Sequence, residues 1–236
     1  MIERQCVNMV RDGIRDKAYF DSAINELNKR VSLYKQRLST GGVVSQNIKL
    51  AKNMVVNMEY QIILLRYSRG DNLSDIRETM MQMIDLFEEC IDQSEYFSVT
   101  KFLSLAILLN IDMSYVLKCF KSINAKYRSD WFISFIVCRY CNIEFDNNLK
   151  VLDNRFAVYK DIATGNADEL SAYLNKIWYG SFKDQPWYDS HKAKGNAYKG
   201  YFCFEAGAIV KVLNLDDSNL KNCQYYPYDL VHFEVW

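Results

Sequence analysis

The chain has 236 residues, half of them apolar and a quarter charged, which excludes an intrinsically disordered protein and allows one or two domains with a large core. Its 29 basic and 29 acidic side chains cancel, which argues against nonspecific nucleic-acid binding because that requires a basic excess. Only two prolines and nine glycines occur, fewer than the many turns of a sandwich or barrel usually need, so the composition favours helices.

Two long amphipathic segments open the chain. Apolar side chains recur at steps of three and four over residues 20–38 and again over 44–65, which is the spacing of one helix face. Gly41-Gly42 separates the segments, and Gly70 follows the second where a helix commonly ends. Two long helices joined by a short turn predict an antiparallel hairpin.

A third predicted helix carries the clearest charge pattern. Ser74 is a plausible N-cap, and Ile76, Met80 and Phe87 belong to an apolar stripe. The opposite face is acidic, in a part of the chain where residues 71–100 hold eight acidic side chains and one basic one. This face is either the solvated side of an amphipathic helix or an anionic docking surface for a basic partner. Its carboxylates are Asp75, Glu78, Asp85, Glu89 and Asp92.

Shorter helices are expected along the remainder, with no strand alternation to compete with them. Asp112 is a plausible N-cap for one of them, and the polar stretch 144–148 is a candidate boundary. The sequence therefore predicts an all-α fold, a helical hairpin followed by a multi-helix bundle. We expect an N-terminal region 1–143 and a C-terminal region 144–236, packed together as one unit. The predicted helices span 96–109, 112–125, 129–142, 149–163, 167–179 and 196–214, with a loop at 180–195 and a short helical turn at 216–222.

Cysteine usage predicts reduced thiols. The seven cysteines are odd in number and their spacings form no disulfide framework. Cys138 and Cys141 form a CxxC, but no second such pair completes a tetrahedral zinc site. Two buried thiols are the preferred interpretation, and redox or metal chemistry is the alternative. The N-terminus lacks the apolar core of a secretory signal, and no stretch is long enough to span a bilayer, so a cytoplasmic location is expected.

Catalysis has weak support in the sequence. No phosphate-binding glycine loop, HExxH or EF-hand loop is present. His191, with Asp189 and Ser190 nearby, could serve a hydrolase, but no nucleophile turn accompanies it, and we expect His191 to fix its loop through hydrogen bonds. Glu205 falls among apolar positions of the predicted helix 196–214. It is either a buried carboxylate satisfied by hydrogen bonds or a catalytic group without a partner motif.

The C-terminal block carries a specific motif. It contains Tyr201-Phe202-Cys203-Phe204-Glu205-Ala206-Gly207-Ala208, then Leu215-Asp216-Asp217-Ser218 and a terminal Tyr225-Tyr226-Pro227-Tyr228-Asp229-Leu230. This block resembles the C-terminal domain of PoNi immunity proteins, with Phe202 where Trp is usual and Gly207 where Ala is usual. Residues 15–21 and Arg66-Tyr67-Ser68-Arg69-Gly70 are similar to the other half of that family.

The resemblance implies an all-helical bacterial protein that binds a cognate PoNe-type DNase toxin. It implies no catalytic residue, cofactor, metal, membrane or direct nucleic-acid contact. An acidic face could mask the basic DNA-binding surface of such a toxin, and Asp216, Asp217 and the terminal tyrosines are a second candidate docking site. We expect Tyr225, Tyr226, Pro227, Tyr228 and Asp229 to pack onto the body. The alternatives are a helical scaffold or oligomerisation protein without a toxin partner, and a hydrolase that uses Glu205, His191 and Asp189.

Overall fold

The computed structural model describes residues 10–91, 94–164 and 168–235. About 66% of the chain is helical, and the β pairing among the described residues is one isolated bridge between Asp130 and Lys150. The predicted all-α class is therefore confirmed. The chain forms two compact units, Met1–Met80 with Asp189–Tyr201, and Met81–Tyr188 with Phe202–Trp236. The division into 1–143 and 144–236 remains a prediction.

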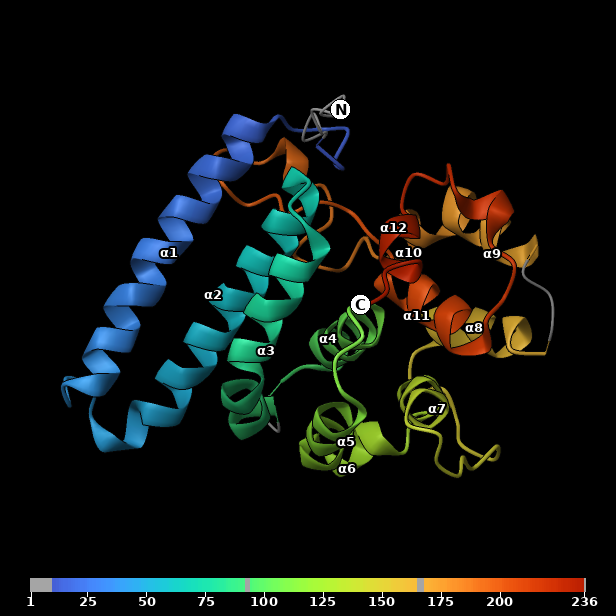
Figure 1. Cartoon of the computed structure of the whole chain (residues 1–236), viewed down its shortest axis with the longest axis horizontal. Coiled ribbons are helices and arrows are strands. Elements are labelled where there is room, and N and C mark those ends of the chain that lie inside the picture. Colours follow the sequence, from blue (N-terminus) through green and yellow to red (C-terminus); the bar gives the residue numbers. More distant parts are fainter. Residues whose placement is uncertain (1–9, 92–93, 165–167, 236) are drawn as a thin grey trace, which may run out of the picture. The chain divides into compact units, whose positions relative to one another are not determined.

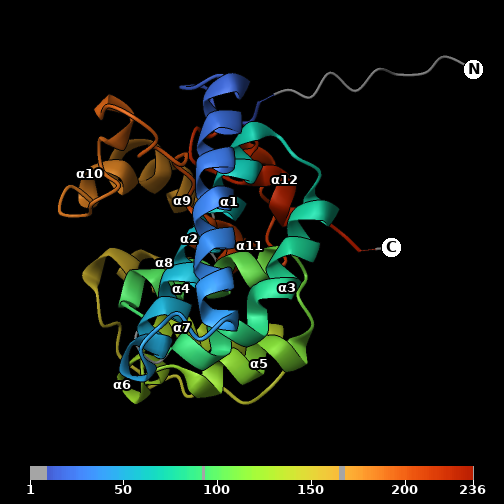
Figure 2. The same ribbon diagram turned by 90° about the vertical axis from the view of Figure 1, so that its left-hand side faces the viewer.

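The first unit is built on two long helices, α1 (Lys17–Ser39) and α2 (Ile48–Arg69), which lie side by side and run in opposite directions (Figures 1 and 2). The Asp16 carboxylate begins α1 by accepting a hydrogen bond from the Tyr19 N–H at 2.9 Å. The short helix η1 (Ser45–Asn47) leads into α2. Gly70 ends α2 with a φ of 95°, a left-handed conformation that glycine adopts without strain.

The third helix, α3 (Leu73–Cys90), begins slightly earlier than predicted. The side chain of Asn72 accepts a hydrogen bond from the Ser74 N–H at 2.8 Å, so Asn72 is the cap and the prediction of Ser74 was wrong. Upstream of it, Arg66 and Arg69 both pair with Asp71, at 2.8 and 2.7 Å. The residues of α3 up to Met80 belong to the first unit, and those from Met81 onward belong to the second.

A segment distant in sequence completes the first unit. Residues 189–201, which include the short helix η5 (Ser190–Lys192), contact the N-terminal helices through hydrogen bonds. The Ser68 hydroxyl donates to the Lys199 carbonyl at 2.7 Å. The prediction of a helix from residue 196 was wrong, because Gly195 and Gly200 have φ values of 77° and 94° and the segment up to Cys203 is not helical.

The second unit centres on three helices that pack against one another: α4 (Tyr96–Leu108), α7 (Trp131–Tyr140) and α11 (Phe204–Leu213). Most of their side chains are buried, which explains their continuous apolar runs. Asp112 caps α5 (Met113–Ser122) as predicted, whereas α6 (Ala125–Arg128) was not foreseen. The other helices are η3 (Asn154–Phe156), α8 (Ala157–Ile162), α9 (Asp168–Tyr173), the π-helix η4 (Leu174–Trp178), α10 (Tyr179–Ser181), η6 (Ser218–Leu220) and α12 (Tyr228–Val231).

Candidate protein-binding surface

The acidic face of α3 starts in the first unit. Asp75 and Glu78 are exposed there, while Ile76 and Met80 on the opposite side of the helix are fully buried. The apolar side therefore anchors this part of the helix without help from the carboxylates, which remain open to solvent.

The part of α3 that belongs to the second unit carries Asp85 and Glu89, both exposed. The side chain of Asp85 is 75% exposed, and its carboxylate lies 3.4 Å from the Lys118 ammonium. Lys118 also lies 3.5 Å from Glu88, whose carboxylate accepts a hydrogen bond from Ser122 at 2.6 Å. Lys118 thus offsets part of the negative charge, and Glu88 adds to it. Asp92 lies outside the described residues.

The pair Asp216 and Asp217 divides into one exposed and one buried carboxylate. Asp217 is 4% exposed and accepts hydrogen bonds from the Tyr226 hydroxyl at 2.7 Å and from the His232 ring at 3.0 Å. Asp216 is exposed and accepts from the Ser218 N–H at 3.0 Å. Asp216 is therefore the member of this pair that offers a surface charge, and Asp217 is part of the packing.

The terminal motif lies against the second unit. The Tyr225 carbonyl accepts a hydrogen bond from the Cys203 N–H at 2.8 Å. The centre of the Tyr225 ring lies 4.8 Å from the centre of the Trp178 ring. Tyr226 and Pro227 are buried, Tyr228 and Asp229 are half-buried, and the Asp229 carboxylate accepts a hydrogen bond from the Leu230 N–H at 2.9 Å.

Gly207 lies in close contact with the terminal motif. A Cβ atom there would lie 2.9 Å from the Pro227 ring and 3.2 Å from the side chains of Leu108 and Val231. An alanine would thus collide with the terminal motif. Glycine at this position lets the tail pack closely on α11.

Glu205 is buried as predicted, with 1% of its surface exposed, but the expected hydrogen bonds were wrong. Neither carboxylate oxygen has a partner that meets full hydrogen-bond geometry among the described residues, although its own backbone N–H and the Cys203 thiol lie close enough to favour the charged form. Burial raises the pKa of the Glu205 carboxyl, and the positive charge of Lys101 opposes that shift. Burial likewise lowers the pKa of Lys101, whose ammonium lies 4.4 Å from the centre of the Trp187 ring. Such a carboxyl is electrostatically costly in its charged form.

His191 fixes its loop within the first unit. Its ring Nδ1 lies 2.8 Å from the Tyr201 hydroxyl, and its carbonyl accepts a hydrogen bond from Arg15 at 2.6 Å. Asp189 pairs with Lys192 at 2.8 Å. These contacts give His191 the structural role that the sequence favoured over catalysis.

The cysteines are free thiols among the described residues. Cys138 is buried and Cys141 is half-buried, and burial raises the pKa of both thiols, to about 11 for Cys141. A raised pKa keeps a thiol protonated and poorly nucleophilic at neutral pH. Across the described ranges, no group of three His, Cys, Asp or Glu side chains could hold a metal ion. No helix in the described part of the chain is long and apolar enough to cross a membrane.

Two buried acids were not predicted from the sequence. Asp130 is fully buried and accepts backbone hydrogen bonds from Ile133 at 2.9 Å and from Leu152 at 2.8 Å. Burial raises the pKa of Asp130, and these donors oppose the shift. In the first unit, the Asp12 carboxylate accepts a hydrogen bond from the Tyr198 hydroxyl. The position of Asp130 directly before the apolar run that starts at Trp131 is typical of a helix N-cap and could have predicted its role. No local pattern could have predicted the role of Asp12, because its partner Tyr198 is far away in sequence.

The fold and the exposed carboxylates of α3 place the chain in the class of all-α proteins with an acidic helix face. Residues 11–119 match the N-terminal part of the PoNe immunity proteins (PoNi), and residues 129–230 match the C-terminal part. The two matches together span most of the chain, which therefore belongs to the PoNi family of PoNe immunity proteins.

Comparison with solved structures bears on the fold alone. The chain is similar to protein PA2201 from Pseudomonas aeruginosa, whose crystal structure superposes with a TM-score of 0.73 at 14% sequence identity. The match covers 94% of this chain and 89% of that one. No curated protein matches the sequence.

Proposed function

We propose that this chain binds a cognate PoNe-type DNase toxin in the bacterial cytoplasm and neutralises it by occupying the toxin's DNA-binding surface. Family membership supports an immunity role against a PoNe toxin. The observation that carries the docking mode is the row of exposed carboxylates on α3, opposite a buried apolar stripe.

The physical argument rests on charge. A DNase must present cationic groups to the phosphate backbone, and carboxylates on a rigid helix can occupy those groups in place of phosphate. Complementary charges on the rim of an interface act mainly on the association rate. They are screened beyond about 8 Å at physiological salt, so their effect depends on ionic strength.

The test reverses charge on one part of the helix. Asp85→Lys with Glu89→Lys should slow association with the toxin and weaken the salt dependence of the rate, because the attraction becomes repulsion. A matched control, Glu144→Lys with Asp161→Lys, changes the net charge by the same amount at exposed positions away from α3. Stopped-flow association at low and high salt compares the two variants with the parent.

Equal rates for the parent and the α3 variant at low salt would show that this face is a solvated surface only. The next candidates would be Asp75 and Glu78 on the first unit and Asp216 on the second. Reversal of each tests them in the same assay. Helicity measured by circular dichroism checks that the variants stay folded.

A further inference from the structure

A second exposed surface lies at the end of the first unit where α1 connects to α2. The stretch Lys29–Lys52 contains six cations and no acidic residue. The cations are Lys29, Arg30, Lys35, Arg37, Lys49 and Lys52, and all except Lys52 are exposed. We name this stretch the cationic end. Its charge is opposite to that of the α3 face.

The cationic end also carries large apolar side chains in solvent. Four of the eleven exposed large hydrophobic residues of the described chain lie within these 24 positions. Their exposed fractions are 45% for Leu33, 64% for Val44, 40% for Ile48 and 57% for Leu50. Scattered exposed aliphatic residues are ordinary, and four of them within 24 positions are a concentration that suits an interaction site.

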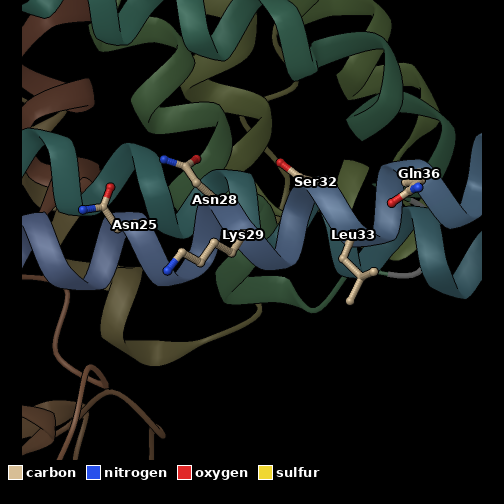
Figure 3. A pocket seen from close by; sticks show the side chains of 6 residues that line it. All are labelled: Asn25, Asn28, Lys29, Ser32, Leu33 and Gln36. Carbon is tan, nitrogen blue, oxygen red and sulfur yellow. The ribbon is translucent and has the colours of Figure 1, made fainter.

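A shallow hollow runs along the outer side of α1 and reaches this end (Figure 3). Its lining side chains are uncharged or cationic and can hydrogen-bond, apart from the apolar Leu33. They are Asn25, Asn28, Lys29, Ser32, Leu33 and Gln36. Their spacing of three and four residues places them on one stripe of the helix.

The fold of the first unit does not need these side chains. The opposite side of α1 supplies the packing through Phe20, Leu27 and Val31, which are at most 7% exposed. Lys35 of α1 pairs with Glu59 of α2 at 2.5 Å and helps to hold the two helices together. The exposed stripe is therefore available for a partner, on a rigid support.

The residue types at the cationic end indicate which class of partner it would bind. Phosphate recognition uses Lys and Arg but gains nothing from exposed Leu, Ile and Val, whereas a protein interface has an apolar core, is enriched in Arg and has a polar, solvent-accessible rim. We infer that the cationic end and the α1 stripe dock a protein surface that combines acidic and apolar side chains. Resting on the proposed function, this surface belongs to the cognate toxin, so that the chain contacts it through two surfaces of opposite charge.

Two variants test this docking by independent means. Leu33→Gln with Ile48→Gln removes apolar contact, and Lys29→Glu with Arg30→Glu reverses charge. Both change exposed residues only, so the folded structure should persist. The control is Lys176→Glu with Lys183→Glu, two exposed cations of the second unit that lie outside α3 and α5. Calorimetry measures binding to purified, catalytically inactive cognate toxin.

The inference predicts that each variant raises the Kd about tenfold or more, while the control stays within about twofold of the parent. Parent-like affinity in both variants would overturn it and leave the proposed function intact. Failure of the parent itself to bind the toxin would overturn the proposed function as well. Sedimentation with phosphatidylglycerol vesicles and a gel-shift assay with duplex DNA complete the test. Binding of either by the parent, lost in both variants, would assign this surface to a membrane or to nucleic acid instead.

Discussion

Individual buried acids decide the local stability of the second unit. The Asp130 carboxylate is fully buried and accepts hydrogen bonds from two backbone N–H groups, one at the start of α7 and one at Leu152. Loss of a cap costs about 1 kcal/mol, and a stranded buried donor costs roughly 1–3 kcal/mol more.

Asp130→Ala should therefore lower the free energy of unfolding by roughly 2–4 kcal/mol, as measured by urea denaturation. Asp112→Ala is the matched control, because Asp112 caps α5 from an exposed position and should cost only about 1 kcal/mol. Equal losses in the two variants would show that the second bond of Asp130 contributes nothing.

Burial of Glu205 should make the free energy of unfolding depend on pH. Its folded pKa is raised by burial, so the folded state holds a proton that the unfolded chain has released above about pH 4.3. Its contribution to stability is complete below that pH and declines as the pH rises towards neutral. Glu205→Gln carries no such proton and should gain stability relative to the parent between pH 4 and pH 7.

Urea denaturation of both proteins at several pH values measures this difference. A difference that is the same at pH 4 and pH 7 would contradict the raised pKa. The Ala variant is less informative, because it also leaves a cavity whose cost does not depend on pH.

At the scale of elements, the terminal segment is part of the second unit. Tyr226 and Leu230 are buried, and the Lys211 ammonium donates to the carbonyls of Leu108 and Phe233, both at 3.0 Å. Deleting residues 224–236 would expose apolar surface on α11 and remove partners of a half-buried lysine. We expect the truncated protein to lose cooperative thermal unfolding, followed by circular dichroism. A truncated protein that unfolds like the parent but no longer protects cells would instead make the tail a toxin-contacting element.

Element boundaries show what the sequence could and could not predict. Periodicity located α1, α2 and α3 within a few residues because each has one buried stripe and a clear end such as Gly70. It failed at residues 196–203, where apolar residues continue without a helix because Gly195 and Gly200 adopt positive φ angles. Periodicity records burial, and a buried extended segment produces the same apolar run as a buried helix.

The candidate site was predictable only in part. The exposure of Asp75, Glu78, Asp85 and Glu89 follows from their helical spacing against the buried stripe. The burial of Asp217 does not, because it depends on Tyr226 and His232 arriving from a later part of the chain. The same holds for residues 189–201, which join the first unit through long-range hydrogen bonds that leave no local pattern.

For the whole molecule, we propose that the chain neutralises the DNase activity of its cognate toxin by binding it. The most direct test is cleavage of plasmid DNA by the purified toxin during titration with this chain. We expect cleavage to fall to background near one equivalent of the chain. When the toxin concentration is close to the Kd, high salt should raise the amount of chain needed for inhibition. Undiminished cleavage with the chain in large excess over the toxin would contradict it.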